Sequence, residues 1–155
     1  MTIDDIIAHV TAHENVVTMR PQEGDGTPEL AWGDVFFFYS PTRSIPPTQP
    51  FATIVTKDYP DDTGSRLDPP GRFRLNIAAG REAFERHVGA APREHTPEPT
   101  PHLDDRIFAH PVYGAHGWLA VVEPGEATDA AARELLDTAY EAARRRRERR
   151  TERDT

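Results

Sequence analysis

Residues 110–123, HPVYGAHGWLAVVE, form the stretch around which the rest of the chain is organised. Two histidines, a tyrosine and two glycines come before a tryptophan and a short apolar run. The apolar run favours a buried strand, and the glycines favour a loop that leads into it. Loops held in place by strands frequently carry the functional side chains of a protein. The stretch therefore predicts a strand of the sheet with a candidate site beside it.

Length and charge restrict the classes of protein to which the chain can belong. Its 155 residues suffice for one domain, and the lack of cysteine excludes disulfides and thiolate metal sites. Seven arginines and three acidic residues give segment 144–155 a charge of +4, so the net charge of −8 leaves −12 on residues 1–143. An acidic body repels phosphate backbones, and we expect nucleic-acid binding only through the arginine-rich segment.

The chain carries no sign of a targeting or membrane segment. Its start, MTIDDIIAHV, is acidic where a secretory signal peptide is basic, and no apolar run approaches the roughly 18 residues of a membrane span. We therefore expect a soluble, cytoplasmic protein without a membrane partner.

Hydrophobic periodicity predicts an amphipathic helix near each end of the chain. Within residues 3–13, isoleucine and valine recur at positions i, i+3, i+4 and i+7. After Thr128, a residue type that caps helices, apolar residues recur at helical spacing up to Ala143. Beyond Ala143 the apolar stripe gives way to arginine, and we expect residues 144–155 to form a frayed tail.

The middle of the chain predicts strands and one short helix. Residues 81–88 lie between two glycines and favour a two-turn helix, whereas β-branched and aromatic runs indicate strands. The order of these elements predicts an α+β domain over residues 1–143, with an antiparallel sheet of about 4–5 strands and three helices mostly on one face. We expect the other face to be partly free. The expected strands are residues 16–19, 33–39, 51–56, 71–78 and a last strand that starts at 107–108, is interrupted by the loop and is completed by 118–123.

Four segments of the chain carry a family resemblance. They are FFFY (36–39), FATIVT (51–56), PGRFRLNIAAGREAF (70–84) and HPVYGAHGWLAVVEPGEAT (110–128). In this order they resemble a family of small bacterial proteins that is described only as a domain of unknown function, over nearly the whole chain up to about residue 143. The closing pattern, a GW before a strand and LLxxAY in a final helix, is more distantly similar to YjbR/MmcQ-like α+β proteins. That likeness implies DNA binding, which the acidic body of this chain opposes.

Residues 71–78 supply the first candidate binding side chains. Arg72, Arg74 and Asn76 alternate with apolar residues and therefore share the face of the strand that points away from the core. Two guanidinium groups on one face can hold a carboxylate or phosphate by bidentate hydrogen bonds, with Asn76 fixing its orientation. The alternative is a solvated strand face that is paired with neighbouring acids.

The loop of the opening stretch supplies the remaining candidates. A neutral imidazole acts as a general base near pH 7, and His110 and His116 flank this loop. Tyr113 and Trp118 are suited to lining an apolar pocket, although core packing explains them equally well. A metal centre would add His102 and the two aspartates that follow Leu103, but none of these shares an element at ligand spacing with a loop histidine. We expect neither a metal nor a cofactor.

Three functions remain open at this point. The first is a binding domain for a small acidic molecule or a partner protein, with Arg72, Arg74 and Asn76 on the free sheet face and His110, Tyr113 and Trp118 at its rim. The second is a small enzyme in which His110 or His116 is the general base and Arg74 stabilises an anion. The third is nucleic-acid binding through the C-terminal arginines.

Overall fold

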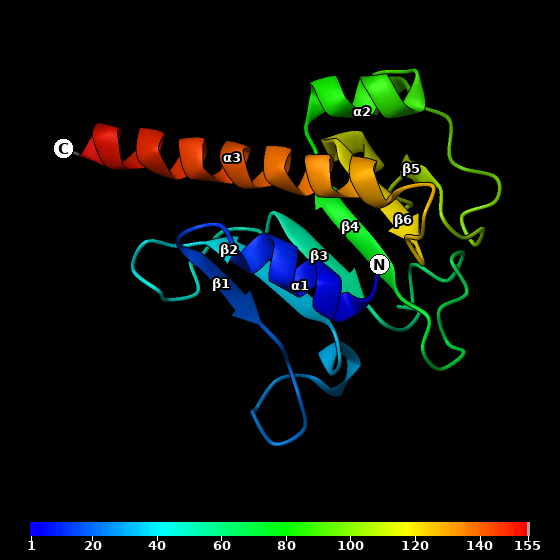
Figure 1. Ribbon diagram of the computed structural model, residues 1–155, viewed down its shortest axis with the longest axis horizontal. Helices are drawn as coiled ribbons and strands as arrows, with labels where there is room; N and C mark the ends of the chain where they lie inside the picture. Colours follow the sequence, from blue (N-terminus) through cyan, green and yellow to red (C-terminus); the bar gives the residue numbers. More distant parts are fainter. Residues whose placement is uncertain (155) are drawn as a thin grey trace.

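A six-stranded antiparallel sheet, with strand order β1-β2-β3-β4-β6-β5, forms the centre of the computed structural model, which describes residues 1–154 (Figure 1). The last residue of the expected tail, 155, lies outside the described residues. The α+β class is confirmed, with six strands in place of the expected 4–5. The strands are β1 (Val16–Met19), β2 (Val35–Tyr39), β3 (Ala52–Val55), β4 (Arg74–Ala78), β5 (Ile107–Ala109) and β6 (Trp118–Val122).

Three α-helices accompany the sheet, α1 (Ile3–Thr11), α2 (Arg81–Val88) and α3 (Asp129–Asp154). A capping box starts α1, because the Thr2 hydroxyl accepts a hydrogen bond from the Asp5 amide and the Asp5 carboxylate accepts one from the Thr2 amide. The α2 helix ends at Gly89 in the left-handed conformation, as the two flanking glycines predict. Within the described residues, no helix has the length and apolarity that crossing a membrane requires.

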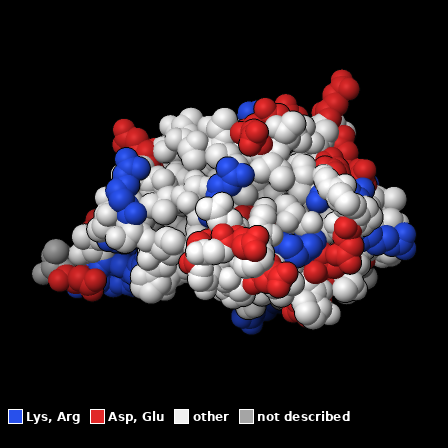
Figure 2. Space-filling model, turned by 90° about the horizontal axis from the view of Figure 1, so that it is seen from below, with Lys and Arg blue, Asp and Glu red and all other residues white. Residues whose placement is uncertain are grey.

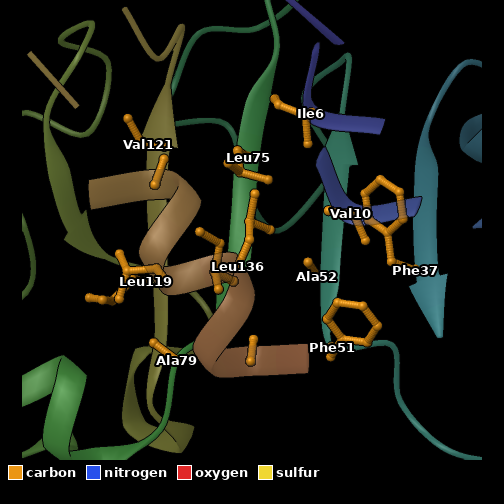
Figure 3. Packing of buried hydrophobic residues seen from close by; sticks show 14 of the residues in the cluster. Ile6, Val10, Phe37, Phe51, Ala52, Leu75, Ala79, Leu119, Val121 and Leu136 are labelled. Carbon is orange, nitrogen blue, oxygen red and sulfur yellow. The ribbon is translucent and has the colours of Figure 1, made fainter. Parts of the chain in front are cut away.

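All three helices contribute to one hydrophobic core on the same face of the sheet. Leu136 of α3 packs above Leu75 of β4 and Leu119 of β6, and Ile6 and Val10 of α1 lie on the side of β2 and β3 (Figure 3). These positions are the apolar ones that the helical and strand periodicities predict. Burial of this stripe is what fixes the helices on the sheet.

The α3 helix continues well past the point where the sequence predicts fraying. It remains helical through the arginines to Asp154, and its C-terminal end projects past the sheet (Figure 1). Arg144 forms ion pairs with Glu141 and Glu148, one turn away on either side, at N–O distances of 2.7 Å. Arginine has a high helix propensity, and such i,i+3 and i,i+4 pairs stabilise a helix segment that has no apolar stripe.

The other face of the sheet is less free than the sequence predicts. Leu67, from the long loop between β3 and β4, packs on Phe108, Ala120 and Val122 and is 1% exposed. This loop lies over the polar side of β4, so Arg74 and its neighbours are buried and do not face solvent. Local periodicity identified which face points away from the helices, but it carries no information about a loop that folds back over that face.

Candidate functional site

The site begins with two buried polar residues on β4. Arg74 and Asn76 are each 2% exposed and point away from the helices. Asn76 lies opposite Thr53 of β3 in the antiparallel register. The Arg74 Nε donates to Asn76 Oδ1 at 2.8 Å, and Asn76 Nδ2 donates to Thr53 Oγ1 at 3.0 Å. The strand register thus builds a continuous hydrogen-bonded row across two strands.

The charge of Arg74 is already balanced within the chain. Its Nη1 and Nη2 atoms donate to the two carboxylate oxygens of Asp62 at 3.0 and 2.5 Å, and Nη1 also donates to the Ser65 hydroxyl at 2.9 Å. Burial raises the pKa of Asp62, but the adjacent guanidinium group outweighs this effect and holds the pKa below its usual value. Four of the five N–H groups of Arg74 therefore have protein partners.

His110 lies beside the remaining N–H group of Arg74. It follows the last residue of β5 and is 4% exposed. Its Nδ1 atom accepts hydrogen bonds from the backbone N–H groups of Val112 and Tyr113, both at 3.0 Å. Two donors on Nδ1 require the neutral ring to carry its proton on Nε2. Burial, assisted by the charge of Arg74, lowers the pKa of His110 to about 3, so the ring is neutral near pH 7.

The contact between the two side chains joins two donors. His110 Nε2 lies 3.3 Å from Arg74 Nη2, and both atoms carry hydrogen in the tautomer that the backbone imposes. Two N–H groups cannot hydrogen-bond to each other, and an acceptor oxygen in the adjoining space would satisfy both. A carboxylate, carbonyl or hydroxyl oxygen has the chemistry that this pair requires.

A cavity of about 330 Å³ opens above this polar row. An exposed acid, Asp61, lies at its edge, and its other polar lining residues are Gln49, Thr53, Tyr59, Asp62, Arg74, Asn76 and His110. Its size falls at the lower end of the range for small-molecule pockets, and aromatic and aliphatic side chains form most of its walls. These side chains are Phe36, Pro50, Val55, Val112, Tyr113 and Trp118.

The predicted site residues separate into two groups in the structure. Arg74, Asn76, His110, Tyr113 and Trp118 all line the cavity. Arg72 does not. It precedes β4, forms an ion pair with Asp104 at 3.1 Å and donates to the Arg66 carbonyl at 3.0 Å.

His116, the second predicted catalytic residue, also lies away from His110. It is exposed on the turn before β6 and lines an adjoining groove of about 680 Å³, which shares Tyr113 and Trp118 with the cavity but is not lined by His110. Gly117 ends this turn with a φ of +85°, a left-handed conformation that favours glycine. The turn therefore points the two histidines into different spaces.

Asp105, one of the aspartates weighed as a metal ligand, has a structural role. Its carboxylate accepts hydrogen bonds from the backbone N–H groups of Gly125, Ala127 and Thr128 and from the Thr128 hydroxyl. The Thr128 hydroxyl and these amides lower the pKa of Asp105 to about 2. The loop that enters α3 is fixed by this residue.

Asp62, Ser65 and Thr53 are the site residues that sequence reasoning missed. Thr53 could have been found from the strand pattern, because it pairs directly with Asn76 once the register of β3 and β4 is known. Asp62 and Ser65 had none, since they come from a loop whose path depends on tertiary packing.

Comparison with known protein families assigns the chain to one family. A family model described as "Family of unknown function (DUF6194)" matches residues 1–152. The chain belongs to the DUF6194 family. No curated protein and no solved structure matched this DUF6194 chain. The predicted likeness to a family of unknown function is confirmed, and the more distant likeness to YjbR/MmcQ-like proteins stays a prediction.

Proposed function

We propose that the protein binds a small molecule with an apolar body and an oxygen acceptor, and that the 330 Å³ cavity is its site. The observation that carries the proposal is the pair of converging donors, His110 Nε2 and Arg74 Nη2, at 3.3 Å. Buried donors without a partner are costly, and an acceptor oxygen from a ligand removes that cost. Apolar walls around a few fixed polar groups are typical of small-molecule sites.

The same geometry disfavours a general-base role for His110. Its Nδ1 is occupied by two backbone N–H groups, and its Nε2 carries a proton. A pKa of about 3 also makes the ring a weak base near pH 7. His116 lines the adjoining groove, and Arg74 does not. Binding therefore fits the site better than turnover does.

The site requires a hydrogen-bond acceptor in its ligand but does not require a negative charge. Asp62 neutralises the guanidinium charge of Arg74, and Asp61 adds a negative charge at the edge of the cavity. A carboxylate gains from the two donors but faces these acids, whereas a carbonyl or amide oxygen gains without that repulsion. We retain a carboxylic acid as one ligand class and add neutral carbonyl compounds as the other.

Fluorescence titration of Trp118 tests the proposal. Trp32→Phe leaves Trp118 as the only tryptophan in the chain, on the cavity wall. We expect benzoate or benzamide to change its emission in a saturable way, and toluene, which lacks the acceptor, to bind at least about tenfold more weakly, as loss of one hydrogen bond of about 1.4 kcal/mol implies.

His110→Asn provides the matched variant. Its side-chain oxygen can still accept from the Val112 and Tyr113 amides, but it lacks the N–H at the Nε2 position. We expect this variant to bind benzoate and benzamide about tenfold more weakly, and His87→Asn, an exposed histidine on α2, to bind as before. Equal affinity in the two variants, or no saturable signal with any of these probes, would place the function elsewhere.

A second candidate function, nucleic-acid binding, is supported by the direction of the C-terminal arginines. Arg146, Arg150 and Arg153 continue the helical spacing of Ala143, so they extend the stripe that α3 turns toward the sheet. They line the 680 Å³ groove with His116, and no Asp or Glu of the described chain lines it. In Figure 2 basic side chains gather beside the C-terminal end of the chain, at the left of the view.

Anisotropy of a labelled single-stranded oligonucleotide tests this second candidate. We expect binding at low salt that weakens steeply as salt is added, because each neutralised phosphate contributes a slope of about 0.7 in log K against log salt. Arg146→Gln with Arg150→Gln should lower this slope, while Arg145→Gln, which lies outside the groove lining, should not. Lack of binding at low salt excludes this function.

A further inference from the structure

Two histidines and an aspartate meet where the first and last helices contact each other. His9 and His13 lie one turn apart on α1, and Asp137 faces them from α3. The His9 Nε2 and His13 Nε2 atoms lie 2.8 and 2.7 Å from the same atom, Asp137 Oδ1. This is the one group of three potential metal ligands found among residues 1–154.

The three donor atoms are close to the arrangement that a metal ion requires. They all lie within 4.8 Å of one another. Imidazole nitrogen and carboxylate oxygen bind zinc at about 2.0–2.2 Å, so a small opening of the cluster admits an ion. Histidines at positions i and i+4 of a helix project on the same side, which is the standard helical ligand spacing.

The ring of His13 is held in place before any ion arrives. It stacks on Tyr140 of α3 with a centroid distance of 4.2 Å and an interplanar angle of 18°. Tyr140 is itself fixed, because its hydroxyl donates to the Glu14 carbonyl at 2.8 Å. An oriented ligand loses less conformational entropy on binding, so this packing favours metal affinity.

We propose that His9, His13 and Asp137 form a binding site for a divalent transition-metal cation such as zinc. Binding requires each imidazole to carry its hydrogen on Nδ1, so that both Nε2 atoms are free to bind the cation together with Asp137 Oδ1. Two imidazoles and one carboxylate supply three ligands for a borderline cation, and water completes the coordination on the exposed side. Because α1 and α3 are at opposite ends of the chain, bound metal joins the two termini of the domain. The site is independent of the 330 Å³ cavity.

Arg133, a neighbour of His9, opposes the binding of a cation at this site. Its Nη1 lies 3.4 Å from His9 Nδ1, and its Nε forms an ion pair with Asp129 at 2.9 Å. As a donor to Nδ1 it favours the tautomer of His9 with hydrogen on Nε2, the atom that must be free to bind metal. Arg133 also repels a cation. Its removal is therefore expected to strengthen metal binding.

Cobalt(II) serves as the probe, because its visible d–d absorption reports tetrahedral coordination by nitrogen and oxygen. We expect one equivalent of cobalt to bind the full-length protein and to be displaced by zinc. His13→Gln and Asp137→Asn should weaken binding by at least the roughly ten- to hundredfold that loss of an outer-sphere partner costs at metal sites. Arg133→Gln should bind more tightly than the wild-type chain.

The controls separate this site from loss of folding and from unspecific binding. His87→Gln removes an exposed histidine on α2 and should leave cobalt affinity unchanged. Circular dichroism without metal should show the same helical content for all variants. The proposal is overturned if cobalt binding is not saturable, if it survives both ligand substitutions, or if Arg133→Gln weakens it.

Discussion

At the scale of the single residue, His110 links acid stability to the candidate site. Its pKa is lowered from 6.5 to about 3 in the folded protein, so below pH 6.5 the unfolded chain binds a proton that the native ring does not. The contribution of His110 to the free energy of unfolding is therefore fully present above pH 6.5. It decreases by about 1.4 kcal/mol per pH unit as the pH falls toward 3. Urea unfolding at pH 7, 6 and 5 measures this slope.

The His110→Asn variant is the control for that slope. Asparagine preserves an acceptor for the two loop amides but does not titrate. The carboxylates of the chain contribute equally to both proteins, so the variant should lose stability less steeply on acidification by about 1.4 kcal/mol per pH unit. Parallel slopes would show that His110 binds a proton to the same extent in the native and the unfolded states.

Also at the residue scale, the Arg74–Asp62 pair should be costly to break. The two side chains are 2% and 10% exposed, and Asp62→Asn leaves a guanidinium charge buried without its counter-ion. We expect a loss of about 3 kcal/mol in the free energy of unfolding, at the lower end for breaking a buried ion pair. Asp61→Asn, one position away and exposed, should change the same denaturant-unfolding free energy by less than about 0.5 kcal/mol.

At the scale of the element, α3 divides into a part that packs and a part that does not. Leu135, Leu136 and Tyr140 belong to the core, whereas no residue after Ala143 does. A chain that ends at Ala143 should therefore keep its unfolding free energy within about 1 kcal/mol while losing helical circular dichroism. Leu136→Ala should keep the helical signal but lose about 2–5 kcal/mol. A truncated chain that fails to fold would assign the arginine segment a structural role.

At the scale of the whole molecule, the charge distribution opposes compactness. The formal net charge is −8, and its negative part lies on the folded body while the arginines lie at one end. Like charges repel one another, and salt screens them over a Debye length of about 10 Å at 0.1 M. The thermal midpoint at pH 7 should therefore rise between roughly 10 and 150 mM sodium chloride. A falling midpoint would show that ion pairs dominate instead.

The helices and most strands of the fold could be predicted from the sequence, because each follows from the spacing of apolar residues within a short segment. Residues 3–13 and the segment after Thr128 formed the expected helices, and all predicted strands appear in the sheet. The helix through residues 144–154 was missed, since an apolar stripe is only one source of helix stability and side-chain ion pairs are another. The His9–His13 spacing was visible in the sequence, but Asp137, its third member, lies on the other terminal helix.

By itself, the sequence determined the α+β class, the terminal helices, the outward direction of Arg74 and Asn76 and the loop that contains His110, because periods of 2 and 3.6 residues fix which side chains share a face. Only the tertiary structure decided that Asp62 neutralises Arg74, that Arg72 lies outside the cavity and that His110 and His116 occupy different spaces. Those outcomes depend on where loops fold back over the sheet, and loop paths are set by contacts between residues that are distant in the chain.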